Sequence, residues 1–423
     1  MGGEVRTMVG TQVARRGSAH PDVSKRVPCS NDDFFDEEEL AELRAYAAPL
    51  RRVRRVKLAL SFVVDLVLVF AIDLFPKVDD AVGGQPWVVR LFAVAMVSVV
   101  IDTVLGAPFG YWVDLVYEKR SGMSTMTTAT WLKDLVLEIA LAPVFLAVLY
   151  VPAYFAIRHF DAWWLVAGAI IVVAILILKF IAPVLILPRF NKFTPLAEGP
   201  IRARIEEIAE LSGVSIEGVY LMDASKRTNR PNAGMTGFGK TKRVVVNDTI
   251  CEFPMDELSQ VIAHEIGHYR LAHPLKSLPL TALQMPLTLL FVAVVAGNET
   301  LLRWAGVDAL RDPGSLGLFS LAMGVGGLLP SLATQWLSRK FEREADLEAL
   351  ELLSDPTSFV GVWPRMVLDN KANLEPTPWQ RLQATHPDVA ERMQFGIEWA
   401  RMNDVPMTLP PRRTIPDAVA SDA

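Results

Sequence analysis

Residues 264–295 read HEIGHYRLAHPLKSLPLTALQMPLTLLFVAVV, and this stretch joins a cluster of potential metal ligands to a long apolar run. The chain has six histidines, and three of them lie in the first ten of these residues. The apolar run is long enough to cross a bilayer as a helix, which needs roughly 20 residues. The stretch therefore predicts a metal-binding motif at the edge of a membrane.

The composition also indicates a membrane protein. Hydrophobic residues make up 51% of the 423 residues, and the mean hydropathy is +0.29. This is too apolar for an ordinary soluble enzyme of this length. The net charge of −5 gives no reason to expect nucleic acid as a partner. The two cysteines, Cys29 and Cys251, lie far apart and predict neither a disulfide framework nor a thiolate metal site.

Six apolar segments predict a predominantly α-helical integral membrane protein with about six transmembrane helices. They lie at 57–76, 88–108, 135–157, 162–187, 277–296 and 314–336. Glycines and a proline in the sixth segment favour a kink there. We expect a disordered tail at 1–40, a four-helix membrane domain at 41–188, a peptidase domain containing the last two spans at 189–402, and a loose tail at 403–423.

The charges beside the first apolar segment predict its orientation. Four arginines and a lysine crowd its start, at positions 51, 52, 54, 55 and 57, whereas the loop after it has one lysine and two aspartates. The positive-inside rule then places the N-terminus in the cytoplasm. Four spans return the chain to that side, so segments 189–276 and 337–402 can build one cytoplasmic site. In a bacterium the membrane would be the plasma membrane.

The motif itself has the spacing of a zinc-dependent hydrolase. On a helix, His264 and His268 lie one turn apart on one face and can share a Zn²⁺ ion, with Glu265 close enough to take a proton from water. The helix and two β-rich runs around it predict a small zincin-like α/β metallopeptidase domain. A surface helix with an ordinary histidine pair is the plainer alternative. Pro274 stands where a metzincin needs its third histidine.

Two later segments supply further candidates. Glu342 and Asp346 share a helical face, so Glu342 can complete the metal ligands while Asp346 holds a ligand histidine. A solvated helix face explains the same charges. His386 and Arg392 can stabilise an oxyanion, or they can belong to a helix start in which Arg392 pairs with an acid.

With these residues identified, the chain resembles the M48 metallopeptidases, and within them the CAAX prenyl protease 1 branch. The matching segments are HEIGHYRLAH (264–273), EREAD (342–346), THPDVAER (385–392) and NAGMTGFGKTKRVVVNDTI (232–250). The resemblance implies one zinc ion per chain, held by His264, His268 and Glu342, with Asp346 as a partner. It also implies that His386 and Arg392 contact the substrate or the tetrahedral intermediate.

The resemblance further implies how the substrate binds. Asn232 and the strand 243–247, with Val244, Val245 and Val246, would line the cleft and pair with an extended peptide. The substrate would be a peptide or protein, prenylated or membrane-bound. A water-filled chamber between the helices would explain the acids within the apolar segments, which are Asp65, Asp102 and Glu138.

Three functions remain open from the sequence. The first is a membrane-embedded zinc endopeptidase that processes CAAX peptides. The second is an HtpX-type protease that removes misfolded membrane proteins. The third is a membrane scaffold or sensor without catalysis, which is disfavoured because every metal and base position is filled.

Overall fold

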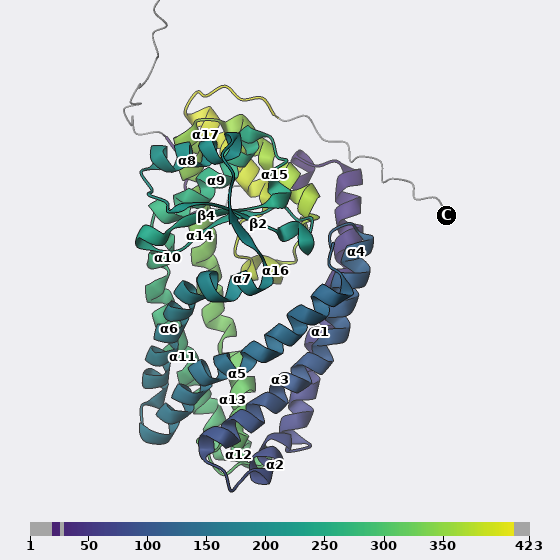
Figure 1. The fold of residues 1–423 in the computed structure, drawn as a ribbon, viewed down its shortest axis with the longest axis vertical. Helices are drawn as coiled ribbons and strands as arrows, with labels where there is room; N and C mark the ends of the chain where they lie inside the picture. Colours follow the sequence, from purple (N-terminus) through teal and green to yellow (C-terminus); the bar gives the residue numbers. More distant parts are fainter. Residues whose placement is uncertain (1–18, 26–28, 410–423) are drawn as a thin grey trace, which may run out of the picture.

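Long helices run the length of the molecule and carry a small sheet-containing domain at one end (Figure 1). A computed structural model describes residues 19–25 and 29–409. The long helices of the membrane domain are α1 (Glu37–Phe70), α3 (Trp87–Tyr111), α5 (Thr128–His159) and α6 (Trp163–Ile181). The later ones are α11 (Leu278–Ala296), α13 (Leu316–Gly326) and α14 (Leu328–Leu353).

All six predicted apolar segments are mainly helical. Among the described residues, three helical stretches are long and apolar enough to span a membrane, namely 87–120, 128–159 and 273–296. Counting two bent pairs as single spans raises this number to five. One bent pair is α1 with α2 (Leu74–Ala81), so the first long helix ends at Phe70, before the predicted limit. The predicted kink in the sixth segment is confirmed by a bend of 42° between α13 and α14.

The part of the N-terminal tail that the structure describes is largely folded. Asp36 caps α1 through a reciprocal capping box with Glu39, and Phe35 is only 2% exposed because it enters the core of the sheet-containing domain. The prediction of disorder is therefore wrong for residues 29–40, since an aromatic side chain ties the segment down. Residues 1–18, 26–28 and 410–423 lie outside the described residues.

The sheet has four strands in the order β1-β2-β4-β3. β4 (Arg243–Asn247) pairs in parallel with β2 (Gly218–Met222) and antiparallel with β3 (Ala233–Thr236), while β1 (Phe193–Pro195) covers the far side of β2. Both sides of β4 are thus occupied, and β3 is an edge strand. This order determines which backbone groups remain open to a ligand.

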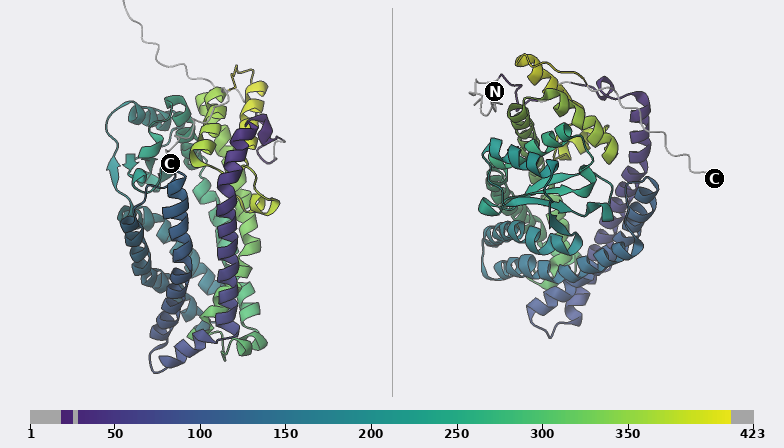
Figure 2. Two further views of the ribbon diagram at one scale, coloured as in Figure 1. Left: turned by 90° about the vertical axis from the view of Figure 1, so that its right-hand side faces the viewer. Right: turned by 45° about the horizontal axis from the view of Figure 1, so that its top comes forward.

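Helices that precede α11 and α13 in the sequence, and helices that follow them, pack around the sheet (Figure 2). α8 (Pro200–Ser212) and α9 (Met255–Arg270) contact each other, and α9 also packs along α14 and α15 (Pro356–Asn370). α17 (Val389–Met402) packs against α15. The shared core contains fully buried Ile262, Ile266 and Phe359. This core holds α9 and α14 in a fixed relation.

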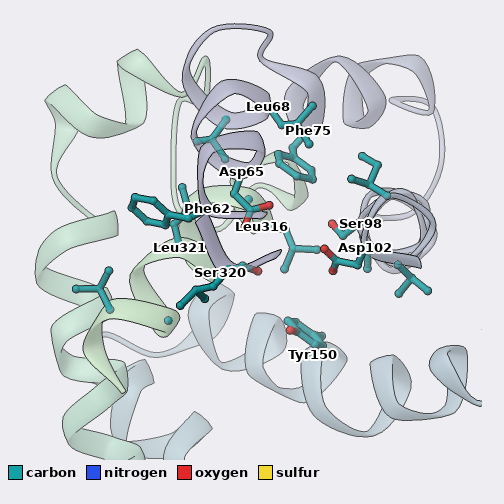
Figure 3. Close-up of a pocket in the computed structure, with 18 of the residues that line it drawn as sticks. Phe62, Asp65, Leu68, Phe75, Ser98, Asp102, Tyr150, Leu316, Ser320 and Leu321 are labelled. Atoms are coloured by element: carbon teal, nitrogen blue, oxygen red, sulfur yellow. The ribbon is translucent and has the colours of Figure 1, made fainter. Parts of the chain in front are cut away.

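A cavity of about 740 Å³ lies between α1, α3, α5 and α13, away from the sheet. Its walls are mostly apolar, but Asp65, Asp102 and Tyr150 turn their oxygens toward it (Figure 3). The prediction that acids of the spans face an interior space is confirmed for the two aspartates. Glu138 is exposed on α5 and does not line this cavity, so its contact with an interior space stays a prediction.

A cysteine at position 65 tests whether this cavity holds water. In a background without Cys29 and Cys251, we expect Asp65→Cys to react with a charged thiol reagent added to the aqueous phase. Val67→Cys is the matched control, because Val67 is 42% exposed on the outside of the same helix and would face lipid. Equal labelling of the two variants would contradict a water-filled cavity.

Candidate metal centre

The two motif histidines lie on one face of α9, as their spacing predicts. Asp256 and Glu257 occupy the first turn of this helix and His268 and Arg270 the last, an order that suits the helix dipole. The rings of His264 and His268 have centroids 4.8 Å apart. Their Nε2 atoms lie 3.2 Å from each other and so converge on one point.

Close packing of α14 against α9 brings the third side chain to this point. Gly267 makes the approach possible, because a Cβ there would lie 3.2 Å from the Cβ of Glu348 on α14. Glu342 Oε2 lies 3.3 Å from His264 Nε2, and Glu342 Oε1 lies 3.4 Å from His268 Nε2. Two segments far apart in sequence therefore present three ligand atoms together.

These three side chains fit a tetrahedral zinc ion. Atoms about 2.0–2.1 Å from a common tetrahedral centre lie about 3.3–3.4 Å from one another. The two Nε2 atoms lie 3.2 Å apart, and the Glu342 carboxylate meets them through Oε2 at 3.3 Å and Oε1 at 3.4 Å, so the separations are close to this spacing. In addition, Glu342 Oε2 is buried and accepts no hydrogen bond, which is costly for a carboxylate oxygen without a ligand. Two imidazoles and a carboxylate are also a donor set typical of catalytic zinc.

Glu265 stands beside the ligands without joining them. A Cβ added to Gly234 on β3 would lie 3.9 Å from Glu265 Oε2, so this carboxylate faces the edge strand. Burial raises the pKa of Glu265, while the neighbouring His264 and His268 oppose that shift. A carboxylate with a raised pKa next to the ligand face is suited to accept a proton.

A buried ion pair lies behind His264. Its Nδ1 is 2.9 Å from Asp346 Oδ1, and Arg392 Nε donates to Asp346 Oδ2 at 2.8 Å. The guanidinium of Arg392 also lies over the ring of Trp363, 3.5 Å from the centroid. Burial favours the neutral form of Asp346, but Arg392 and His264 outweigh it and lower the pKa of this carboxyl.

Arg392 Nη2 also lies 3.9 Å from Glu342 Oε2, and the predicted contact between this arginine and the tetrahedral intermediate stays a prediction. The side chain of Arg392 is 7% exposed and lies on the Nδ1 side of His264, whereas the ligand atoms converge at Nε2. It orients Asp346, as the alternative interpretation of this arginine as an ion-pair partner predicts. His386 differs, because its Nε2 lies 3.4 Å from Glu342 Oε2 and its side chain is 60% exposed beside the centre.

His268 is backed by a second histidine, to which the sequence assigned no role. His268 Nδ1 lies 2.9 Å from His273 Nδ1, and His273 Nε2 lies 3.0 Å from Glu344 Oε2. In its neutral form, an imidazole carries a hydrogen on only one of its two nitrogens. One of its nitrogens can then accept a hydrogen bond while the other donates one.

The edge of the sheet beside Glu265 is formed by β3 and not by β4. Val244 and Val246 are fully buried, and both sides of β4 are already paired. The prediction that Val244, Val245 and Val246 pair with a substrate is wrong, because a central strand has no free backbone groups. Asn232 is exposed next to the start of β3, and its contact with a substrate stays a prediction.

A cavity of about 360 Å³ adjoins the centre. It begins at Glu265 and Glu342 and continues between α11 and α14, with walls that include Met235, Leu280, Leu337 and Phe341. The Tyr269 hydroxyl, also in its wall, donates to the Met235 carbonyl on β3 at 3.2 Å. This space can take an uncharged side chain next to the ligands.

The loop between α3 and α5 supports the segment that leads into β3. Glu118 pairs with Arg230 at 2.8 Å, and Ser124 forms a β-bridge with Thr228. Arg227 pairs with Asp134 near the start of α5 at 2.8 Å. The partners of these two ion pairs lie 112 and 93 residues apart in the sequence, so local patterns could not predict them.

The comparisons with known proteins agree with this architecture. Residues 195–399 match Peptidase family M48, and residues 20–192 match the family described as CAAX prenyl protease N-terminal, five membrane helices. The sequence predicts four spans in that part, one fewer than the description. Helical spans joined to a small α/β domain, with two histidines and a glutamate converging beside a second glutamate, define a membrane metalloendopeptidase. The chain belongs to peptidase family M48, in its CAAX prenyl protease 1 branch.

Several relatives support the branch. A CAAX prenyl protease 1 homolog of Arabidopsis thaliana is 30% identical over 75% of this chain and 78% of its own length. CAAX prenyl protease 1 of Saccharomyces cerevisiae is 31% identical, over 59% and 58% respectively. An uncharacterized metalloprotease of Bacillus subtilis, YhfN, is 29% identical over 68% of each chain. The crystal structure of S. mikatae Ste24p has the same fold, with a TM-score of 0.76 and 23% identity over 88% of this chain and 93% of that one.

Proposed function

We propose that His264, His268 and Glu342 hold one zinc ion per chain and that Glu265 is the general base for peptide hydrolysis. The observation that carries this proposal is the convergence of two imidazole nitrogens 3.2 Å apart on a carboxylate whose two oxygens lie 3.3 and 3.4 Å from them, one of these oxygens being buried without a hydrogen bond. Bound zinc would supply a Lewis acid that lowers the pKa of water to about 7.

The chain's own residues would carry the remaining steps. Glu265 would take a proton from the attacking water and give it to the leaving amine. His386, whose exposed side chain lies 3.4 Å from Glu342 Oε2, would donate to the developing oxyanion. The peptide would add to the edge strand β3 beside Asn232, where backbone groups remain open, and a side chain would enter the adjoining cavity.

We further propose that the substrate is a prenylated CAAX peptide and that the site faces the cytoplasm. Three relatives named CAAX prenyl protease 1, or homologs of it, support this proposal and disfavour the HtpX-type alternative. The arginines and lysine before the first span support the orientation. If the chain is bacterial, the membrane of this proposal is the plasma membrane.

Purified protein in liposomes tests both parts. We expect one zinc ion per chain by elemental analysis, and faster cleavage of a farnesylated CAAX peptide than of the same peptide without the farnesyl group. Equal rates would reject the prenyl preference and favour removal of misfolded proteins. Cleavage of neither peptide, without bound zinc, would favour a non-catalytic scaffold.

A further inference from the structure

His273 is not one of the three converging side chains, yet it is buried directly behind one of them. Its exposed fraction is 3%, and Phe341 stacks on its ring at 4.2 Å with an interplanar angle of 8°. Its Nδ1 faces His268, and its Nε2 faces Glu344. Packing and two polar contacts therefore determine both the position and the direction of this ring.

The backbone takes an unfavourable conformation to put His273 there. α9 ends at Arg270, and Ala272 adopts the left-handed region with φ 56° and ψ 33°, which alanine rarely occupies. Had α9 continued, position 273 would lie about 140° round the helix from position 268. The chain instead turns at Ala272 and begins α10 (His273–Lys276). The ring of His273, its first residue, then contacts the ring of His268.

We propose that His273 is a positioning residue that holds His268 for metal binding, an inference that rests on the proposed zinc site. His268 Nδ1–H donates to His273 Nδ1, and His273 Nε2–H donates to Glu344. This arrangement leaves the lone pair of His268 on Nε2, the atom that faces Glu342. Glu344 is the last residue in this series of hydrogen bonds. Its Oε1 lies 3.7 Å from Lys340 Nζ.

The two ligand histidines are thus held by different means. Asp346, with a side chain 1% exposed, contacts His264 directly, whereas the imidazole of His273 stands between His268 and a carboxylate that is 22% exposed. Without His273, the His268 ring can rotate or carry its proton on Nε2, and a protonated nitrogen cannot bind zinc. Loss of His273 should therefore weaken metal binding before it changes any catalytic step.

Zinc affinity measured against a chromophoric chelator tests this role, together with the visible spectrum of the Co²⁺ form. His273→Phe keeps an aromatic ring against Phe341 but cannot hydrogen-bond, so we expect zinc to bind about 10- to 100-fold more weakly. His273→Gln can accept from His268 and donate to Glu344, so its affinity should stay within about threefold of the original. The zinc affinity of Glu344→Ala should lie between those of these two variants. The Co²⁺ spectrum should change most in the variant that loses most zinc affinity.

Lys276→Ala, at the exposed end of the same short helix, is the matched control and should change neither readout. Melting of the metal-free proteins checks that each variant is folded, and Glu344→Ala carries the test if His273→Phe is not. Unchanged zinc affinity in His273→Phe would overturn the proposal, as would equal losses in the Phe and Gln variants, which would indicate packing alone. Failure of the unaltered protein to bind zinc would instead reject the metal site itself.

Discussion

Glu265→Gln should yield a folded protein that still binds zinc but cleaves peptide about 10²- to 10⁴-fold more slowly, the range expected on loss of a general base. The amide has nearly the shape of the carboxylate but cannot accept the water proton. The effect is selective because Glu265 is not among the three ligands. Cleavage rates at saturating peptide, together with the zinc content, measure it.

Glu210→Gln is the control for this substitution, since Glu210 is exposed on α8, outside the centre. It should leave both the rate and the metal content unchanged. A Glu265→Gln enzyme that cleaves at the original rate would refute the assignment of the base. Loss of zinc in that variant would mean that Glu265 is a ligand.

Asp346→Ala should destabilise the metal-free protein by about 3–5 kcal/mol, because it leaves a buried arginine without its partner. The side chains of Asp346 and Arg392 are 1% and 7% exposed, so water cannot replace the lost carboxylate. Chemical unfolding in detergent measures the change in the free energy of unfolding. Zinc binding should weaken as well, since His264 loses the group that holds its Nδ1.

The exposed pair between Arg202 and Glu206 on α8 provides the comparison. Its side chains are 36% and 48% exposed, so Glu206→Ala should cost no more than about 1 kcal/mol. The double substitution Asp346→Leu with Arg392→Met should recover much of the lost stability, because it removes both charges together. Equal effects of Asp346→Ala and Glu206→Ala would show that the buried pair contributes little.

Local patterns in the sequence were sufficient for the main features of the centre. His264 and His268 share a face because helix geometry acts over four residues, and the apolar segments are long enough to define spans by themselves. Glu342 was predictable because its segment follows a span and matches a known pattern. The predictions that were wrong concern residues whose partners lie far away in the sequence. Phe35, for example, packs into the core of the peptidase domain.

The sequence by itself determined the class of chemistry and the helical membrane architecture, since both follow from spacing and hydrophobicity among near neighbours. Only the tertiary structure decided that β3 and not β4 is the open edge, because strand order depends on pairings between distant segments. It also decided that Arg392 lies behind His264 and that His273 reaches His268. Burial determines the position of Arg392, and the turn at Ala272 determines that of His273. Neither can be read from the residue type or its immediate neighbours in the sequence.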